Sequence, residues 1–144
     1  MNSMLVSSGT AGVIILGHTL LTKTMMTGIW RIAKAGQLGA DNWMMVKDKL
    51  EKIPLYQIMQ ATQLNEAEYA GPLAAVLFFL AAKGVDAPIA STLAVFGQVG
   101  YYWPRVFLAN KDNYNNGFPF YVPAAVARYV AVGMLVLAAW KVVS

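Results

Sequence analysis

The chain contains no cysteine, and this absence excludes disulfides, thiolate nucleophiles and thiolate metal sites. Charge is scarce as well: charged residues make up 12% of the 144 residues, against roughly 25% in soluble domains. The net charge of +4 comes from basic residues that are scattered between apolar segments. No basic run is interleaved with aromatic residues, so the sequence does not indicate nucleic-acid binding.

What the chain does contain is hydrophobic sequence, at 58% of its residues. A membrane-spanning helix needs about 20 predominantly apolar residues. No basic residue precedes the first apolar run, as a secretory signal peptide would normally require, so we interpret that run as a membrane helix. The sequence predicts one all-α domain over 1–144, an integral membrane four-helix bundle with helices at about 5–32, 54–83, 87–108 and 119–143.

Turn and capping residues mark where these helices begin and end. Pro54 suits the first turn of the second helix, where a missing N–H costs nothing. Gly84 closes that helix, and Asp86 is expected to cap the third. The short connection between them predicts an antiparallel hairpin. Asp41 is expected to cap a short interfacial helix over 42–52.

The basic residues are distributed unequally between the two sides of such a bundle. Cytoplasmic loops carry the excess of lysine and arginine. The connections 33–53 and 105–118 are therefore expected on the cytoplasm-like side of the lipid bilayer. Two basic residues belong to the opposite side, Lys83 and Lys141, and seven to the cytoplasm-like side: Arg31, Lys34, Lys47, Lys49, Lys52, Arg105 and Lys111.

A polar stripe interrupts the second helix. Positions 61, 65, 68 and 72 fall on one face, so Asn65 and Glu68 are expected to point together. Polar groups inside a membrane are costly and often functional. Two interpretations stay open: a ligand site with a carboxylate and an amide, or a buried structural pair.

Three other polar residues need an explanation. Arg128 lies about nine residues into the fourth helix and needs a partner there, for which Glu68 has the matching side and depth. Two interpretations of Arg105, at the end of the third helix, stay open: it reaches toward the membrane surface, or it supplies a guanidinium to a ligand site. No carboxylate or second histidine accompanies His18 in the sequence. It is therefore interpreted as a hydrogen-bonded packing residue, and no metal site is predicted.

The stripe also resembles a family signature. In the MAPEG family, the membrane-associated proteins of eicosanoid and glutathione metabolism, the second helix carries Arg-Ala-x-x-Asn-x-x-Glu-(Tyr/Thr)-x-x-Pro. This chain matches its Asn, Glu, Tyr and Pro. An arginine ends the first helix, and Leu38–Asp41 is similar to the family's Leu-Gly-Asp. The resemblance covers roughly 20–140 and rests on Arg31, Asn65, Glu68, Tyr69 and Pro72.

This resemblance implies a bundle that forms a homotrimer and binds glutathione between neighbouring subunits. The implied activity is that of a glutathione transferase or peroxidase acting on lipophilic substrates. Arg31 would be the main cation and Tyr101 would donate to the sulfur, as the catalytic residues. The implied glutathione-binding residues are Arg31, Asn65, Glu68, Tyr69, Tyr101 and Tyr121.

The chain departs from the family pattern at its arginines. Ala61 and Gln98 stand where the family has arginine, and residues 115–117 replace the arginine that begins its fourth helix. Glutathione carries two carboxylates, and arginine binds carboxylates strongly and with fixed geometry. An alternative therefore stays open: a non-catalytic accessory subunit of a larger membrane complex, for example a bioenergetic one, that kept the fold.

Overall fold

The structure, a computed structural model, describes residues 5–35, 43–108 and 118–144, and in these ranges the only regular structure is helix. The four long helical stretches, 8–35, 54–82, 88–108 and 118–143, differ at each end from the predicted ranges by at most three residues. The expected cap Asp41 and the motif Leu38–Asp41 lie outside the described residues. The helical elements are α1 (Ser8–Thr24), the π-helical segment η1 (Met25–Ile29), α2 (Trp30–Ala35), α3 (Trp43–Leu50), α4 (Pro54–Ala82), α5 (Pro88–Leu108) and α6 (Phe118–Val143).

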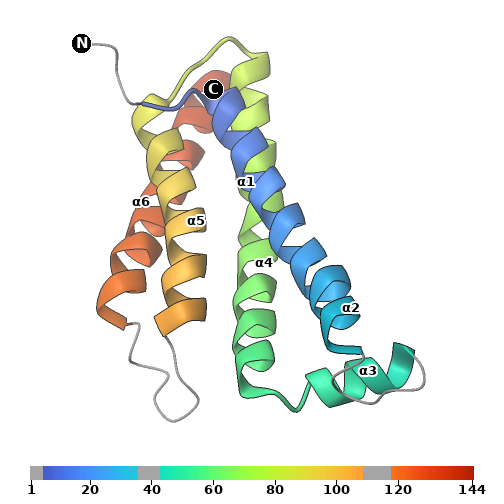
Figure 1. Cartoon of the computed structure of the whole chain (residues 1–144). Coiled ribbons are helices and arrows are strands. Elements are labelled where there is room, and N and C mark those ends of the chain that lie inside the picture. Colours follow the sequence, from blue (N-terminus) through green and yellow to red (C-terminus); the bar gives the residue numbers. More distant parts are fainter. Residues whose placement is uncertain (1–4, 36–42, 109–117) are drawn as a thin grey trace.

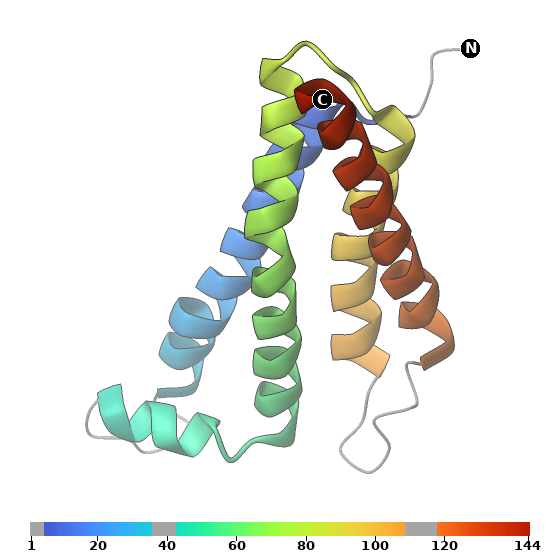
Figure 2. The ribbon, with the colours of Figure 1, turned by 180° about the vertical axis from the view of Figure 1, so that it is seen from behind.

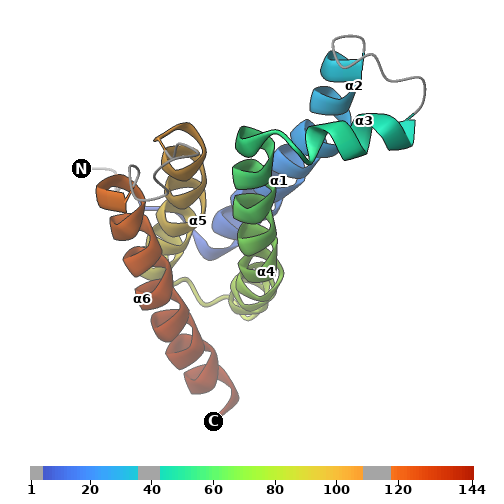
Figure 3. The same ribbon diagram turned by 90° about the horizontal axis from the view of Figure 1, so that it is seen from below.

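The helices associate as two pairs. The arm formed by α1, η1 and α2 packs against α4, and α5 packs against α6 (Figure 1). The start of α1, the α4–α5 connection and the end of α6 lie at one end of the molecule, with α3 at the other (Figure 2). Seen from below, α2 and α3 stand away from α5 and α6 (Figure 3). The two pairs meet where α4 contacts α5 and α6 and where α1 contacts α5.

Local chemistry explains the ends of α4. Pro54 occupies its first turn, and Ile53 precedes it in an extended conformation. At the other end Gly84 has a φ of +69°, a left-handed conformation that favours glycine. This turn lets the Val85 N–H donate to the carbonyl of Leu80 over 2.9 Å. The predicted turn at Gly84 is therefore present, and α5 begins four residues later at Pro88.

Asp86 has a different role from the one expected. Its Oδ1 accepts from the backbone N–H of Ser8 over 2.8 Å and from the Ser8 hydroxyl over 3.1 Å. The unpaired N–H groups at the start of a helix attract a carboxylate from wherever the fold brings one. Asp86 thus fastens the start of α1 to the α4–α5 connection, and the prediction that it caps the third helix is wrong.

Buried side chains divide the interior into three layers. An apolar cluster near the α4–α5 connection joins α1, α4, α5 and α6, and includes Ile15, Leu77 and Leu135. A second cluster, near α3, includes Met26 and Leu50. Between them along α1, α4 and α5 lies a polar layer, to which α6 contributes one residue. Its nearly inaccessible members are Thr22, Thr62, Gln63, Glu66, Gln98 and Arg128.

Two of the described helical stretches are long and apolar enough to cross a membrane, Ser8–Ile32 and Pro119–Val143. The fold leaves several large apolar side chains exposed on these stretches, such as Leu20 at 68% and Leu137 at 63%. α4 and α5 have 29 and 21 residues, but the polar layer interrupts their apolar sequence. The all-helical prediction is confirmed, with two candidate membrane spans.

Candidate functional site

Arg128, on α6, is the most deeply buried cation of the described structure. Only 1% of the surface of this residue is exposed. Nη2 donates to Oδ1 of Asn65 on α4 over 3.0 Å. Nε and Nη1 are buried without a hydrogen-bond partner. Among the described residues no ion pair joins this guanidinium to a carboxylate.

Tyrosine rings surround the same guanidinium. Its Cζ lies 3.9 Å from the ring centroid of Tyr69, 4.6 Å from that of Tyr101 and 5.8 Å from that of Tyr129. A cation over an aromatic face is attracted by the ring's negative face, and the attraction grows when water is excluded. The rings offset part of the desolvation cost of Arg128, but they accept none of its unpaired N–H groups.

A second arginine extends this aromatic cluster. Tyr101 meets Tyr121 edge to face, with centroids 5.6 Å apart. Arg105 Nη1 donates to the Tyr101 hydroxyl, and its Cζ lies 5.3 Å from the Tyr101 ring and 5.9 Å from the Tyr121 ring. Arg105 therefore packs inward on tyrosines one turn earlier on α5 and at the start of α6. The interpretation that Arg105 reaches toward the membrane surface did not include its contacts with Tyr101 and Tyr121.

Gly97 explains why Arg128 can sit here. A Cβ built on Gly97 would lie 2.6 Å from both the backbone N and the Cβ of Arg128, closer than real Cβ atoms approach. Only glycine allows α5 and α6 to come this near. The close crossing places the Arg128 side chain between the two helices and α4.

An apolar groove adjoins the cluster. It has a volume of about 250 Å³ and lies between α4 and α6. Tyr69 belongs both to this groove and to the surroundings of Arg128, so one ring separates the guanidinium from the groove. Glu68, which is exposed, supplies the only charged side chain of its wall. The lining residues are Glu68, Tyr69, Pro72, Leu73, Val76, Val132, Leu135 and Val136.

The structure brings together part of the residue set that the resemblance implies. Asn65, Tyr69 and Tyr101 contact or face Arg128, and Tyr121 packs on Tyr101. Arg31 lies elsewhere, half-buried on α2, the segment that packs against α3. Within one chain the residues therefore form a site on α4, α5 and α6, with Arg31 on a different arm.

The expected pair of Arg128 with Glu68 is wrong. Arg128 donates to Asn65, and Glu68 points into the groove wall with its side chain exposed. The neutral amide lies at the depth of the guanidinium, while the carboxylate, one turn further along α4, keeps its contact with the exterior. Asn65 and Glu68 share a side of α4, but they do not converge on one partner.

A second polar centre lies on the α1 side of α4. The Glu66 carboxylate is fully buried. Its Oε1 lies 2.6 Å from His18 Nδ1 and 2.9 Å from the Thr19 hydroxyl, and its Oε2 accepts from the Thr22 hydroxyl over 2.9 Å. All three groups belong to α1. The prediction that His18 is hydrogen-bonded is confirmed, but its partner is a carboxylate that the sequence did not associate with it.

Residues of α5 complete the Glu66 centre. Gln98 donates through Nε2 to the Glu66 backbone carbonyl over 2.5 Å. The His18 ring meets Tyr102 and Trp103 edge to face, at centroid distances of 5.6 and 5.8 Å. Three buried atoms here, His18 Nε2, Tyr102 Oη and Gln98 Oε1, have no hydrogen-bond partner. Gln98, at a position where the MAPEG pattern has arginine, thus links α5 to the backbone of α4.

Sequence reasoning missed Glu66 and the central position of Arg128. The motif drew attention to Glu68, whereas the buried carboxylate is two residues earlier. One signal was present: His18, Thr19 and Thr22 place polar groups on one side of an otherwise apolar helix, a pattern that indicates a buried acceptor.

The arrangement can therefore bind an anion at Arg128, next to an apolar groove, and holds a satisfied carboxylate on the other side of α4. Searches of protein-family models, of curated proteins and of solved structures found no match to this chain.

Proposed function

We propose that the chain is a multi-pass membrane protein of the MAPEG type and that it binds glutathione with Arg128 as the principal cation. In this proposal all four long helical stretches cross the bilayer, with α3 and the end of α5 on the cytoplasm-like side. The bound glutathione serves a transferase or peroxidase reaction on lipophilic electrophiles. The motif Asn65–Glu68–Tyr69–Pro72 and the observed cluster around Arg128 support it.

The observation that carries the proposal is the unmet hydrogen-bonding capacity of Arg128. A buried cation normally has an anion beside it, because an isolated buried charge is costly. Here the guanidinium has one neutral acceptor and two unpaired nitrogens. A ligand carboxylate or thiolate would supply the missing charge. Charge-assisted bonds to arginine are the stronger kind and are often bidentate.

Arg128 offers a cation to replace those that the family pattern has at Ala61 and Gln98. It comes from α6, and Gly97 gives it room beside α5. Tyr69 covers the guanidinium on the groove side. A ligand anion in the groove would reach Nε and Nη1 once this ring turns aside. Asn65 then stays bound to Nη2 and orients the fork.

The apolar groove suits the lipophilic co-substrate. Seven of its eight lining residues lack a charge, and Glu68 stands as the single charged member. A molecule dissolved in the bilayer would enter between α4 and α6. The glutathione thiolate, held by Arg128, would form a C–S bond to an electrophilic carbon as the leaving group takes the bonding electron pair. Stabilising the thiolate by fixed charge is the catalytic contribution of the protein.

The trimer is part of the same proposal. Arg31 lies apart from Arg128 in one chain, and a neighbouring copy would supply its own Arg31 to a site between subunits. Exposed apolar residues on α1 and α6 provide surface for such contacts. Tyr101 and Tyr121, which pack edge to face beside Arg105, would then line the entrance from the cytoplasm-like side.

The test is isothermal titration of glutathione into the detergent-solubilised full chain at millimolar concentrations. Wild type is expected to bind, and Arg128→Gln to lose at least a factor of about 10 in affinity, equivalent to about 1.4 kcal/mol. Lys83→Gln is the matched control, because it removes an exposed cation at the C-terminal end of α4, away from the cluster around Arg128. No heat with wild type refutes glutathione binding, and equal affinity in Arg128→Gln refutes the role of Arg128.

A second candidate function has its own observation. Ala75, Ala81 and Ala82 are exposed on the second half of α4, whereas Ala74 is buried. Small exposed residues let another membrane helix approach closely. They favour the accessory subunit of a larger membrane complex. Native extraction in mild detergent followed by mass measurement decides: a trimer of this chain alone contradicts the accessory role, and a larger assembly supports it.

A further inference from the structure

The Glu66 centre has a feature that glutathione binding does not use. Its carboxylate receives hydrogen bonds from three side chains of α1, and one of them, His18, is the only histidine of the chain. The side chain of His18 is 9% exposed and that of Glu66 is inaccessible. Histidine is the side chain whose unperturbed charge changes between about pH 5 and pH 8. A proton on His18 therefore decides whether this buried site is an ion pair or a lone carboxylate.

The two protonation states differ in energy for a simple reason. With a protonated His18, the charge of Glu66 is matched across 2.6 Å. With a neutral His18, the hydrogen bonds remain, but among the described residues no other cation forms an ion pair with this carboxylate. An uncompensated charge in an apolar interior is strongly unfavourable. Opening the contact to water relieves that cost.

The other charged groups on α1 and α5 are exposed or bound elsewhere: Lys23 of α1 is exposed, and Arg105 of α5 donates to the Tyr101 hydroxyl. α4 contributes Glu66 itself and α5 contributes Tyr102, whose ring faces His18. Arg128 of α6 donates to Asn65, on the side of α4 that faces α6, and Lys141, the other charged residue of α6, lies in its last turn. The thiol groups that could also titrate in this range are absent, because the chain has no cysteine.

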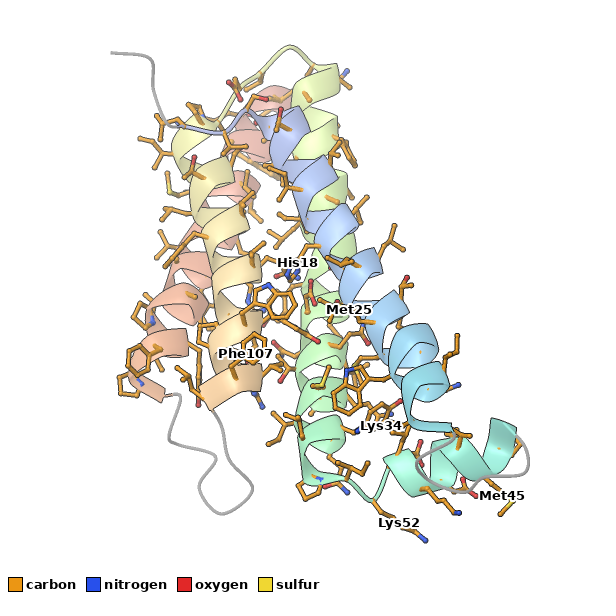
Figure 4. The ribbon with its side chains drawn as sticks, in the orientation of Figure 1. His18, Met25, Lys34, Met45, Lys52 and Phe107 are labelled. Carbon is orange, nitrogen blue, oxygen red and sulfur yellow. The ribbon has the colours of Figure 1, made fainter. Side chains whose placement is uncertain are left out.

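The pair lies where the arm can open. α1 and α4 run side by side near the α4–α5 connection and diverge toward α2 and α3 (Figures 1 and 3). Figure 4 places His18 about midway along the arm, between α1 and the neighbouring helices. The π-helical segment η1 begins seven residues after His18 at Met25, and π-helical turns are a less regular part of a helix.

We propose that His18 and Glu66 form a proton-binding site that fastens α1 to α4. Binding of a proton closes the contact, and its release loosens η1 and α2 from α4. This site acts on the position of the arm and does not depend on glutathione or on Arg128.

The absence of native cysteine makes the test direct, because spin labels can be attached at introduced cysteines alone. One pair goes on Ile32 of α2 and Leu64 of α4, which are 71% and 60% exposed. A reference pair goes on Phe96 of α5 and Val126 of α6, at 51% and 54%. Distances are measured by pulsed electron paramagnetic resonance on the full chain in lipid nanodiscs at about pH 5.5 and about pH 8.5, either side of the ordinary histidine range.

The 32–64 distances are expected to be narrowly distributed at the lower pH, and longer and broader at the higher pH. The 96–126 distances are expected to stay unchanged. His18→Gln should give the broad distribution at both pH values. Thr22→Val removes a neutral donor from the same carboxylate and should keep the response to pH.

Two results would overturn the proposal, and the first needs no variant in the pair. Identical 32–64 distributions of the labelled chain at both pH values show that no proton controls the arm. A response to pH that persists in His18→Gln assigns the proton to another group. If His18→Gln fails to fold, as judged by circular dichroism, Glu66→Gln replaces it, and a persisting response there refutes the pair equally.

Discussion

Two consecutive residues of α4 serve opposite kinds of polar centre. Glu66 presents a buried anion to α1 and receives three side-chain hydrogen bonds. Asn65 presents a neutral oxygen to α6 and receives one bond from Arg128, a cation with two unpaired nitrogens. Both charges are inaccessible, so the difference lies in how completely the protein satisfies them.

This difference separates a charge that holds two helices together from a charge that can bind an ionic ligand. A buried charge whose bonds are all made within the chain has no open bond for such a ligand, and removing it leaves several donors unpaired. A buried charge with open bonds can gain a ligand at little cost to the fold. The Glu66 carboxylate is of the first kind and the Arg128 guanidinium of the second.

The largest expected effect is that of Glu66→Ala. His18, Thr19 and Thr22 would lose their common acceptor. Breaking a buried charge pair by removing one partner costs about 3–5 kcal/mol. We expect a loss of this size in the free energy of unfolding, measured in detergent by thermal or denaturant unfolding followed by circular dichroism.

Glu68→Ala is the matched control for that change, because it removes the same side chain from an exposed position two residues later. It is expected to alter the free energy of unfolding by about 0.5 kcal/mol or less, as surface substitutions usually do. Equal losses in the two variants would contradict the structural role of Glu66.

Gly97→Ala tests the close crossing on which the Arg128 centre depends. The new Cβ would meet the backbone of Arg128 at 2.6 Å, so α5 and α6 must separate. Inserting a methyl group into a well-packed contact costs about 1–3 kcal/mol, and a backbone obstacle puts the loss at the upper end. Gly133→Ala on α6 meets no atom within 4 Å, so it should be neutral in the same unfolding measurement. A neutral Gly97→Ala would show that the helices are not held this close.

A smaller effect is expected from Thr22→Val, which removes one donor of the Glu66 carboxylate and keeps the side chain's shape. Hydrogen bonds to charged groups contribute about 1.5–3 kcal/mol, so a loss near the lower value is expected. Thr24→Val is the control. Thr24 lies two residues further on, is exposed, and donates only to the carbonyl of Leu20. If both variants lose the same stability, the bond from Thr22 to Glu66 does not stabilise the fold.

Much of the fold could be predicted because its signals are local. Pro54 and Gly84 mark the ends of α4 by their own backbone preferences, and long apolar runs mark the other helices. Asp86 was misplaced because its partner, Ser8, lies 78 residues away in the sequence. In the sequence, an aspartate that caps its own helix cannot be distinguished from one that caps a different helix.

The candidate site was harder to predict because its centre depends on helix rotation. The motif singled out Asn65 and Glu68 together, and matching side and depth favoured Glu68 as the partner of Arg128, whereas Asn65 is the residue that accepts from it. The pairing of His18 with Glu66 joins helices whose relative rotation no local pattern specifies. Tertiary packing decides such contacts, and a single sequence does not show how its helices pack.

Among the substitutions of buried residues, Arg128→Met has the smallest expected effect on stability, and it is the sharpest test of the comparison. Methionine fills a similar volume and removes two unpaired buried nitrogens. It also loses the bond to Asn65 and the stacking on Tyr69 and Tyr101. Replacing buried charges by apolar residues is often neutral or stabilising, so we expect a change within about 1 kcal/mol in the same unfolding measurement. A loss as large as that of Glu66→Ala would mean that Arg128 is as structural as Glu66, and the distinction between the two centres would fail. A near-neutral result means that the fold does not need this buried cation. Binding of a ligand anion would then explain why Arg128 is there.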